Sequence, residues 1–265
     1  MLQPSRFFVL RLFPGVLLLG SLLQAPAHAA DDPAARKILD ATVAKNSAGF
    51  QTGQSTTLLT LRLQNGKEKT WQTLARVARK DAKLRTRVTF LAPADSVGVE
   101  LLMLEQGRGQ TTQYLYLPKT RRLRRMGGSD RNSAFMGTDF SFGDLEGRGL
   151  QVGEAKKLGA EVIGGVPCTK IDVRSQDPED PYGHVEIWVD EAKSVARQMK
   201  FYGKDGAHQK TLIVDEVAEV EGRATLKKFR MLSHVRGSVT TVTTQAIDTR
   251  AALPDALFEP ESLGR

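Results

Sequence analysis

The sequence predicts a mainly β fold: a large curved antiparallel sheet forming an unclosed (half-open) β-barrel of about 10–12 strands, with a few helices covering its mouth. From residue 59 onward, apolar and polar residues alternate with a period of two, which is typical of strands that bury one face. Turn signals rich in Gly, Asn and Asp separate these runs. No linker, charge block or low-complexity run divides them, so one domain is expected.

Residues 1–29 have the pattern of a cleavable signal peptide. Two arginines precede a short apolar run at residues 16–23, and Ala27-His28-Ala29 then gives a small-x-small cleavage site. The apolar run is well short of the ~20 residues that a membrane-spanning helix needs. We therefore expect cleavage between Ala29 and Ala30, export to the periplasm, and a single mature domain over residues 30–265.

The next elements follow from local signals. Asp32 can cap a helix over residues 31–45, and Pro33 suits its first turn. Asn65-Gly66 is a strong hairpin signal in the sheet that follows. A short helical turn is expected at residues 254–258. The candidate strands are 59–63, a strand around Trp71, 84–90, 99–105, 111–117, 152–163, 166–175, 183–190, 195–203, 208–219, 223–235 and 238–248.

The segment from Tyr114 to Leu145 is the most informative part of the chain. An alternating strand runs into a cluster of arginines, and a glycine turn then leads to apolar residues set among small and acidic ones. This pattern suits a surface that covers something apolar, with cations at its edge. The residues expected to form an acyl-chain cavity or its lid are Phe135, Met136, Phe140, Phe142, Leu145, Trp71, Leu101, Met103, Tyr114 and Tyr116.

The arginines have two interpretations of equal weight. They can form a rim that meets phosphate or carboxylate headgroups. Alternatively, the cluster after the strand can be a charged edge strand that resists aggregation. The residues expected in the headgroup rim are Arg121, Arg122, Arg124, Arg125 and Arg131.

Composition and charge narrow the function further. The formal net charge is +8 for the full sequence, and removal of the two arginines of the expected signal peptide leaves a mild excess of about +6. This excess favours anionic lipid headgroups or an acidic partner protein. The basic residues lack interleaved aromatic residues, so no nucleic-acid partner is expected. The one cysteine, Cys168, lies in an alternating strand pattern and is expected to be a small core residue rather than a reactive thiol.

No pattern of residues indicates an enzyme, a cofactor or a metal site. The expected mature chain has three histidines, His184, His208 and His234, which are far apart in sequence and are expected to be solvated or hydrogen-bonded strand residues. Asp139, Asp144 and Glu146 are available as general acids, but capping and pairing with arginines is the favoured interpretation. We therefore expect no catalytic residues, no metal and no cofactor.

Several motifs together resemble a known family. They are YLYLP at residues 114–118 with the arginines after it, S-x-R-x-S-x-F-M-G-T-D-F-S-F-x-D-L at 129–145, W-V-D at 188–190, and L-F-E-P-E-S-L at 257–263. The chain resembles the outer-membrane lipoprotein-sorting proteins with a LolA/LolB-like fold. It lacks the R-P-x-x-F-R-W segment by which the LolA carrier is usually recognised.

The resemblance implies a half-open barrel around a cavity for lipid or lipoprotein acyl chains. The expected function is a periplasmic carrier or accessory protein for transport towards the outer membrane, with an inner-membrane exporter as a partner and transient membrane contact. The chain is expected to be a monomer. The alternative is a non-enzymatic interaction module, with a filled core, that docks on an exporter or envelope complex.

Overall fold

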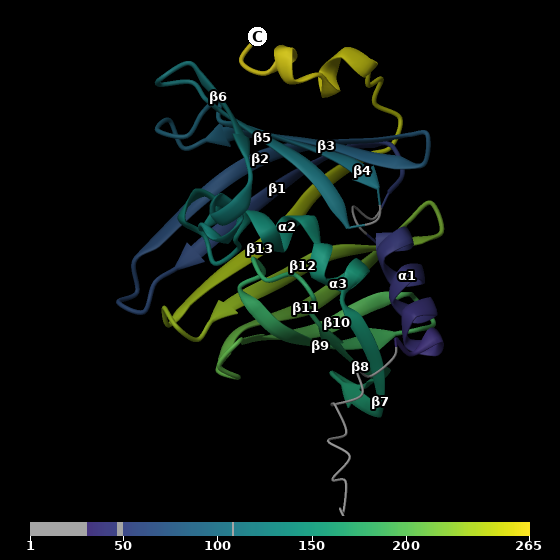
Figure 1. The fold of residues 1–265 in the computed structure, drawn as a ribbon. Helices are drawn as coiled ribbons and strands as arrows, with labels where there is room; N and C mark the ends of the chain where they lie inside the picture. Colours follow the sequence, from purple (N-terminus) through teal and green to yellow (C-terminus); the bar gives the residue numbers. More distant parts are fainter. Residues whose placement is uncertain (1–30, 47–49, 108) are drawn as a thin grey trace, which may run out of the picture.

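The computed structural model describes residues 31–46, 50–107 and 109–265 (Figure 1). The expected signal peptide and its cleavage site at Ala29 and Ala30 lie outside the described residues. Among the described residues, no helix combines the length and the apolar character needed to cross a membrane.

The described chain forms one antiparallel sheet of 13 strands that does not close, with the order β6-β5-β4-β3-β2-β1-β13-β12-β11-β10-β9-β8-β7. This agrees with the predicted half-open barrel. The first half of the sheet contains β1 (Gly53–Arg62), β2 (Glu68–Lys80), β3 (Lys83–Ala92), β4 (Glu100–Gly107), β5 (Gln110–Leu117) and β6 (Arg122–Met126). The second half contains β7 (Glu154–Ile163), β8 (Val166–Arg174), β9 (Tyr182–Asp190), β10 (Val195–Gly203), β11 (His208–Val220), β12 (Arg223–Ser233) and β13 (Ser238–Asp248).

The two halves are meanders that meet at the middle of the sheet. β1 pairs with β13 from Gln54↔Asp248 to Arg62↔Val239, with a register shift between Thr56 and Thr57. The outermost strands, β6 and β7, are consecutive in the chain, and residues 127–153 connect them. This connection contains the 3-10 turns η1 (Gly128–Asn132) and η2 (Phe135–Gly137) and the helices α2 (Phe142–Glu146) and α3 (Arg148–Val152). We call residues 127–153 the central segment.

The helices lie on the concave face of the sheet. Figure 1 shows α2 and α3 inside the curl, with α1 (Pro33–Asn46) beside them over the second half of the sheet. Asp32 caps α1 as expected, because its carboxylate accepts the backbone N–H of Ala34 at 2.9 Å. The backbone N–H of Lys157, with those of Ala34 and Ala35, lowers the pKa of Asp32. These bonds hold the start of α1 against β7.

The apolar residues separate into two clusters, one on each face. The main cluster fills the concave side and includes Trp71, Phe90, Leu101, Ile187 and Met231, each at most 2% exposed. The second cluster lies on the convex face, where the C-terminal segment, with the turns η3 (Asp255–Phe258) and η4 (Pro260–Ser262), covers part of the first half of the sheet (Figure 1). The alternation seen in the sequence therefore serves two apolar layers at this end of the molecule.

The C-terminal segment is attached through a buried ion pair. Arg87 and Glu100 approach to 2.7 Å with side chains that are 5% and 9% exposed. The Arg87 guanidinium also donates to the Leu257 carbonyl at 3.1 Å, and Glu100 accepts the backbone N–H of Gly264 at 2.8 Å. The segment thus satisfies charges that would otherwise face an apolar cluster.

Candidate functional site: a cavity on the concave face

A cavity of about 660 Å³ lies between α1, the sheet and α2. Strands from both halves of the sheet contribute to its wall, because β1 and β13 pair across the middle. Its volume falls in the range of about 300–1,000 Å³ that is usual for small-molecule sites. The apolar residues that line it are Val43, Ala44, Phe50, Ala75, Val77, Ala82, Leu84, Met103, Leu145, Leu226, Phe229, Val242 and Ile247.

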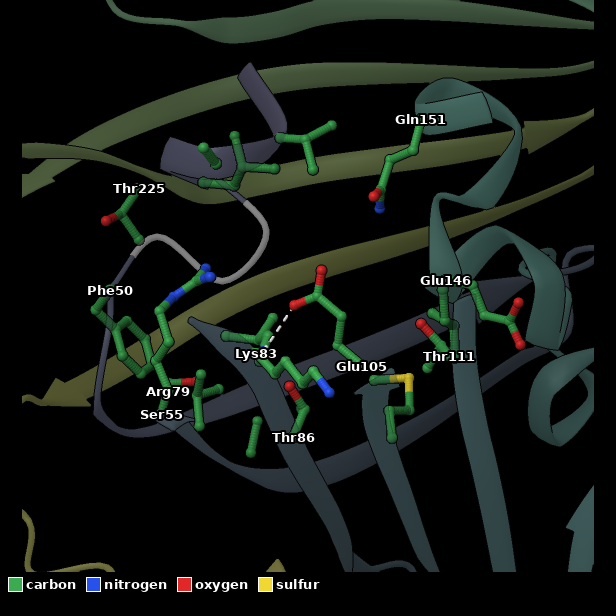
Figure 2. Close-up of a pocket in the computed structure, with 18 of the residues that line it drawn as sticks. Phe50, Ser55, Arg79, Lys83, Thr86, Glu105, Thr111, Glu146, Gln151 and Thr225 are labelled. Atoms are coloured by element: carbon green, nitrogen blue, oxygen red, sulfur yellow. Dashed lines mark hydrogen bonds between the residues drawn. The ribbon is translucent and has the colours of Figure 1, made fainter. Parts of the chain in front are cut away.

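The same cavity carries charged groups of both signs from the β2–β3 and β4–β5 ends of the sheet. Figure 2 shows Arg79, Lys83 and Glu105 projecting towards its middle. Glu105 accepts the backbone N–H of Leu84 at 2.7 Å, and Arg79 donates to the Ala82 carbonyl at 2.7 Å. The Nε atom of Arg79 is buried and has no hydrogen-bond partner. A ligand with an apolar body and a polar end fits this combination.

A second cavity of about 170 Å³ lies on the other side of the central segment. It is bounded by Phe140 and Leu150 of that segment and by Tyr182, Phe201 and Met231 of the sheet. Glu146 of α2 lines both cavities. The part of the central segment around Glu146 therefore separates the larger cavity from the smaller one.

Three aromatic residues of the central segment fill the centre of the hollow. Phe135, Phe140 and Phe142 are 4–6% exposed. Phe135 packs edge-on against Phe142 with ring centroids 5.5 Å apart, and Phe140 packs against Phe229 of β12 at 6.1 Å. The hollow is consequently filled at its centre, and the two cavities lie on either side of this aromatic group.

Polar contacts fix the central segment to the second half of the sheet. The buried Asp139 carboxylate accepts hydrogen bonds from Ser238 and Thr240, at 2.5 and 2.8 Å. Arg236 lies 3.3 Å from that carboxylate and donates to the Thr138 carbonyl at 2.8 Å. The favoured interpretation of Asp139 as a paired residue is confirmed.

Asp144 and Glu146 act in the same way. Asp144 and Ser141 form a capping box at the start of α2, and Asp144 also accepts from Tyr182 and Lys210, each at 2.8 Å. Burial, together with the neighbouring Asp144 charge, raises the pKa of Tyr182, so its hydroxyl stays a neutral donor. Glu146 pairs with Arg131 at 3.2 Å. These carboxylates hold the segment in place.

The residues expected in the cavity or lid separate into groups. Met103 and Leu145 line the larger cavity, and Phe140 lines the smaller one. Met136 packs against the main cluster on the concave side. Four of the other expected residues are buried members of that cluster: Trp71, Leu101, Phe135 and Phe142.

Tyr114 and Tyr116 require a correction. Both belong to the convex cluster with Leu102 and Phe258, on the opposite face from the cavities. Tyr116 lies so close to Gly264 that a Cβ atom there would approach its ring to 2.2 Å. The register of β5 decides this, because neighbouring residues alternate between the two faces.

The arginines also differ from the expected single rim. Arg122, Arg124 and Arg125 belong to β6, which is an edge strand, and Arg121 precedes it. None of the four lines either of these cavities. Arg131 lies apart from them, half-buried, where it pairs with Glu146 and borders the smaller cavity. The cluster forms a charged edge strand, and the expected headgroup rim is not formed at the larger cavity.

The histidines are brought together on the convex face, although they are far apart in sequence. His184, Tyr202, His208 and His234 form a row with successive ring centroids 4.4, 5.1 and 4.2 Å apart. Burial first, and then the neighbouring His234, lowers the pKa of His208. All three are hydrogen-bonded as expected, but only His184 and His208 lie in strands, because His234 begins the β12–β13 turn. Within the described part of the chain, no group of three or more His, Cys, Asp or Glu could hold a metal ion.

Sequence reasoning missed most of the polar groups at the cavity. Arg79 and Lys83 flank the β2–β3 turn, where charged residues are common on solvated hairpins, so nothing in the sequence marks them. Arg236 lies in the β12–β13 turn and gives no signal of its contact with the central segment. The alternation along β13 does indicate that Val242 faces the concave side, but it does not indicate which strands pair with β13. Cys168 is 3% exposed, which confirms the core interpretation.

Comparisons with known proteins agree on the fold. A domain from Vibrio parahaemolyticus, provisionally described as an outer membrane lipoprotein-sorting protein, superposes with a TM-score of 0.80 at 20% identity, covering 88% of this chain and 99% of that chain. A DUF1329 family protein from Desulfovibrio piger gives 0.79 at 22% identity, covering 89% and 100%. A LolA superfamily protein from Nitrosomonas europaea gives 0.66 at 18% identity, covering 87% and 98%.

At the level of sequence, no curated protein matches this chain. One family model, described as an uncharacterized protein, matches residues 82–265. That match spans β3 to the C-terminus and includes the central segment. The chain therefore belongs to this family of uncharacterized proteins, and its fold is LolA-like.

Proposed function

We propose that the protein is a periplasmic carrier or accessory protein that binds lipid or lipoprotein acyl chains in the larger cavity. The observation that carries the proposal is the cavity of about 660 Å³ with apolar walls from both halves of the sheet. Each methylene removed from water contributes about 0.8 kcal/mol, so one long acyl chain gains on the order of 10 kcal/mol. This gain suffices to keep a lipid in a soluble protein.

The ends of the cavity support an amphipathic ligand. The acyl chain lies against Val77, Phe229 and Val242, while the polar end meets Arg79 and Lys83. The unpartnered Nε of Arg79 supports this assignment because a buried donor without an acceptor is unfavourable until a ligand supplies one. The likeness to lipoprotein-sorting proteins supports the same class of cargo.

A pair of variants on β13 tests the proposal. Thr244 lines the cavity, whereas its neighbour Thr243 faces the opposite side of the sheet. We expect Thr244→Phe to fill the cavity and reduce binding of a fluorescent fatty acid by roughly tenfold or more, a loss of about 1.4 kcal/mol. Thr243→Phe should bind like the parent protein, and thermal unfolding checks that both variants fold.

Native mass spectrometry of the gently purified protein gives the second measurement. Co-purifying lipid of defined mass supports carriage. A protein that is free of lipid and binds no fatty acid, or whose two threonine variants behave alike, contradicts it.

The alternative is an interaction module that docks on an inner-membrane exporter or envelope complex. The aromatic residues that fill the centre of the hollow favour it, because Phe135, Phe140 and Phe142 occupy space that a carrier would leave for its cargo. Retention of a membrane partner by a protein that contains no lipid would support this alternative.

A further inference from the structure

The exposed edge of the first half of the sheet carries a dense group of cations. We call the residues 119–125, from the β5–β6 turn through most of β6, the basic edge. All of them except Leu123 and Thr120 are Lys or Arg, and those of β6 are exposed. Within the described residues, Arg124 forms an ion pair with Asp130 at 2.7 Å, while Arg121, Arg122 and Arg125 have no carboxylate partner.

The basic edge lies away from the lipid cavity. In β5, Thr111 lines the cavity, whereas Tyr114 pairs with Arg125 and Leu117 pairs with Arg122. These two partners lie about 10 Å and about 20 Å along the strand from Thr111. Figure 1 shows β6 at the opposite side of the sheet from α1, which covers the cavity. The basic edge is therefore separate from the lining of the larger cavity.

Exposed aliphatic side chains accompany the cations. Leu123 is 46% exposed in the middle of β6. Leu91, near the end of β3, and Val97, in the β3–β4 connection, are 42% and 50% exposed. This connection lies against the β5–β6 turn, because a Cβ on Gly98 would meet Pro118 at 3.6 Å. Protection of an edge strand explains the arginines but not the aliphatic side chains among them.

We propose that the basic edge is a docking surface for an anionic lipid bilayer. Guanidinium groups bind lipid phosphates, and leucine and valine side chains enter the boundary between headgroups and acyl chains. A basic cluster next to exposed aliphatic residues is the combination that such a surface recognises. The exposed apolar residues lie on two strands and a loop and not in a groove, which favours a bilayer over a folded acidic partner. Docking uses no cavity residue, so it is independent of lipid carriage.

Vesicle flotation with the purified protein tests the charge requirement. We expect the protein to bind vesicles of phosphatidylethanolamine with phosphatidylglycerol but not those of phosphatidylcholine alone. Binding should weaken as salt rises, because the screening length falls from about 30 Å at 0.01 M to about 3 Å at 1 M. Equal binding to both vesicles, or binding to neither, overturns the proposal.

Two matched pairs of variants locate the surface. Arg122→Glu with Arg125→Glu should reduce binding roughly tenfold or more. Lys156→Glu with Lys193→Glu changes the net charge equally on the other half of the sheet and should have little effect. Leu123→Asn should weaken binding, whereas Leu158→Asn, at a site 47% exposed on the opposite edge strand β7, should not.

Equal losses within either pair would overturn the assignment, because the attraction would then come from the overall charge or from general exposed apolar area. Binding of polyglutamate or DNA that depends on Arg122 and Arg125, without an effect on vesicle binding, would assign the surface to an acidic macromolecule and also overturn it. All four variants change exposed residues, and thermal unfolding confirms that each remains folded.

Discussion

Asp139 is an acidic side chain with no exposed area, placed where the central segment meets the β12–β13 turn. Its carboxylate is stabilised by the Ser238 and Thr240 hydroxyls and by the guanidinium of Arg236. Burial of a carboxylate is costly unless such hydrogen-bonding and ionic partners are present. The contact between Asp139 and Arg236 therefore helps to hold the central segment against the sheet, together with the contacts of Asp144 and Glu146.

Arg236→Met should release this contact. The variant loses the bonds to the Gly137 and Thr138 carbonyls and the ion pair with Asp139, while the aliphatic part of the side chain is kept. We expect the free energy of unfolding to fall by about 1–3 kcal/mol, nearer the lower value because Arg236 is partly exposed. Urea unfolding measures the loss, and amide exchange at residues 134–142 should accelerate more than exchange in the sheet.

Arg250→Met, at an exposed arginine after β13, is the control and should leave both quantities unchanged. If Arg236→Met has no greater effect than this control, the polar contacts do not hold the segment.

For single residues, the sequence predicts the role of a side chain better than it predicts which residue that side chain contacts. The acidic residues of the central segment were expected to cap and pair, and they do, because short polar side chains beside a helix start have few other roles. Their partners were not predictable. Arg236 lies 97 positions from Asp139, and the contact exists only because β12 and β13 bring the turn across the hollow.

The C-terminal segment is the element that stabilises the convex face. Phe258 is 2% exposed, packs in the cluster with Leu102, and lies under the guanidinium of Arg85 at 4.7 Å from its ring centroid. The turn η3 brings it there, close to the position expected from the sequence at residues 254–258. The segment thus closes an apolar layer that the sheet alone would expose.

Phe258→Ala should cost about 3–5 kcal/mol of unfolding free energy, because a fully buried aromatic side chain is lost and its cavity remains. Chemical denaturation at equilibrium gives this value. Leu158→Ala, at a half-exposed site, should change stability by no more than about 0.5 kcal/mol. A comparable effect of both substitutions would mean that the segment rests on the sheet without stabilising it.

Most of the strands were predictable as elements because each follows from alternation between turn residues. The exception is β6 (Arg122–Met126), in which four of the five residues are exposed. No buried face therefore imposes an apolar–polar alternation on this strand. The face on which each strand residue lies was less predictable. Tyr114 and Tyr116 share the period expected of cavity residues, but a second apolar layer on the convex side satisfies the same pattern.

The whole sheet depends on strands that pair across a long separation in sequence. β1 and β2 lie at its centre, between β3 and β13, although they come first in the chain. Alternation contains no information on which strands pair, so the join between β1 and β13 was not predictable from the sequence. The half-open shape was predicted from the number of strands and from the family resemblance.

A fragment of residues 82–265, the part matched by the family model, should therefore fail to fold. Removing β1 and β2 leaves β3 and β13 without their inner partners and takes Leu59, Leu61 and Trp71 from the main cluster. We expect no cooperative unfolding transition and strong binding of a hydrophobic dye. A fragment with native-like near-ultraviolet circular dichroism would contradict this, and residues 31–265 serve as the folded control.

The path of the chain has a consequence for the size of the hollow. The two free margins of the sheet, β6 and β7, are tied together by only the 27 residues of the central segment. Chain length therefore limits how far these margins can separate, independently of any contact that the segment makes. Insertions at the exposed turns of the central segment should permit a wider curl of the sheet and larger ligands. Deletions there should narrow the hollow, while the strands of both meanders stay paired as before.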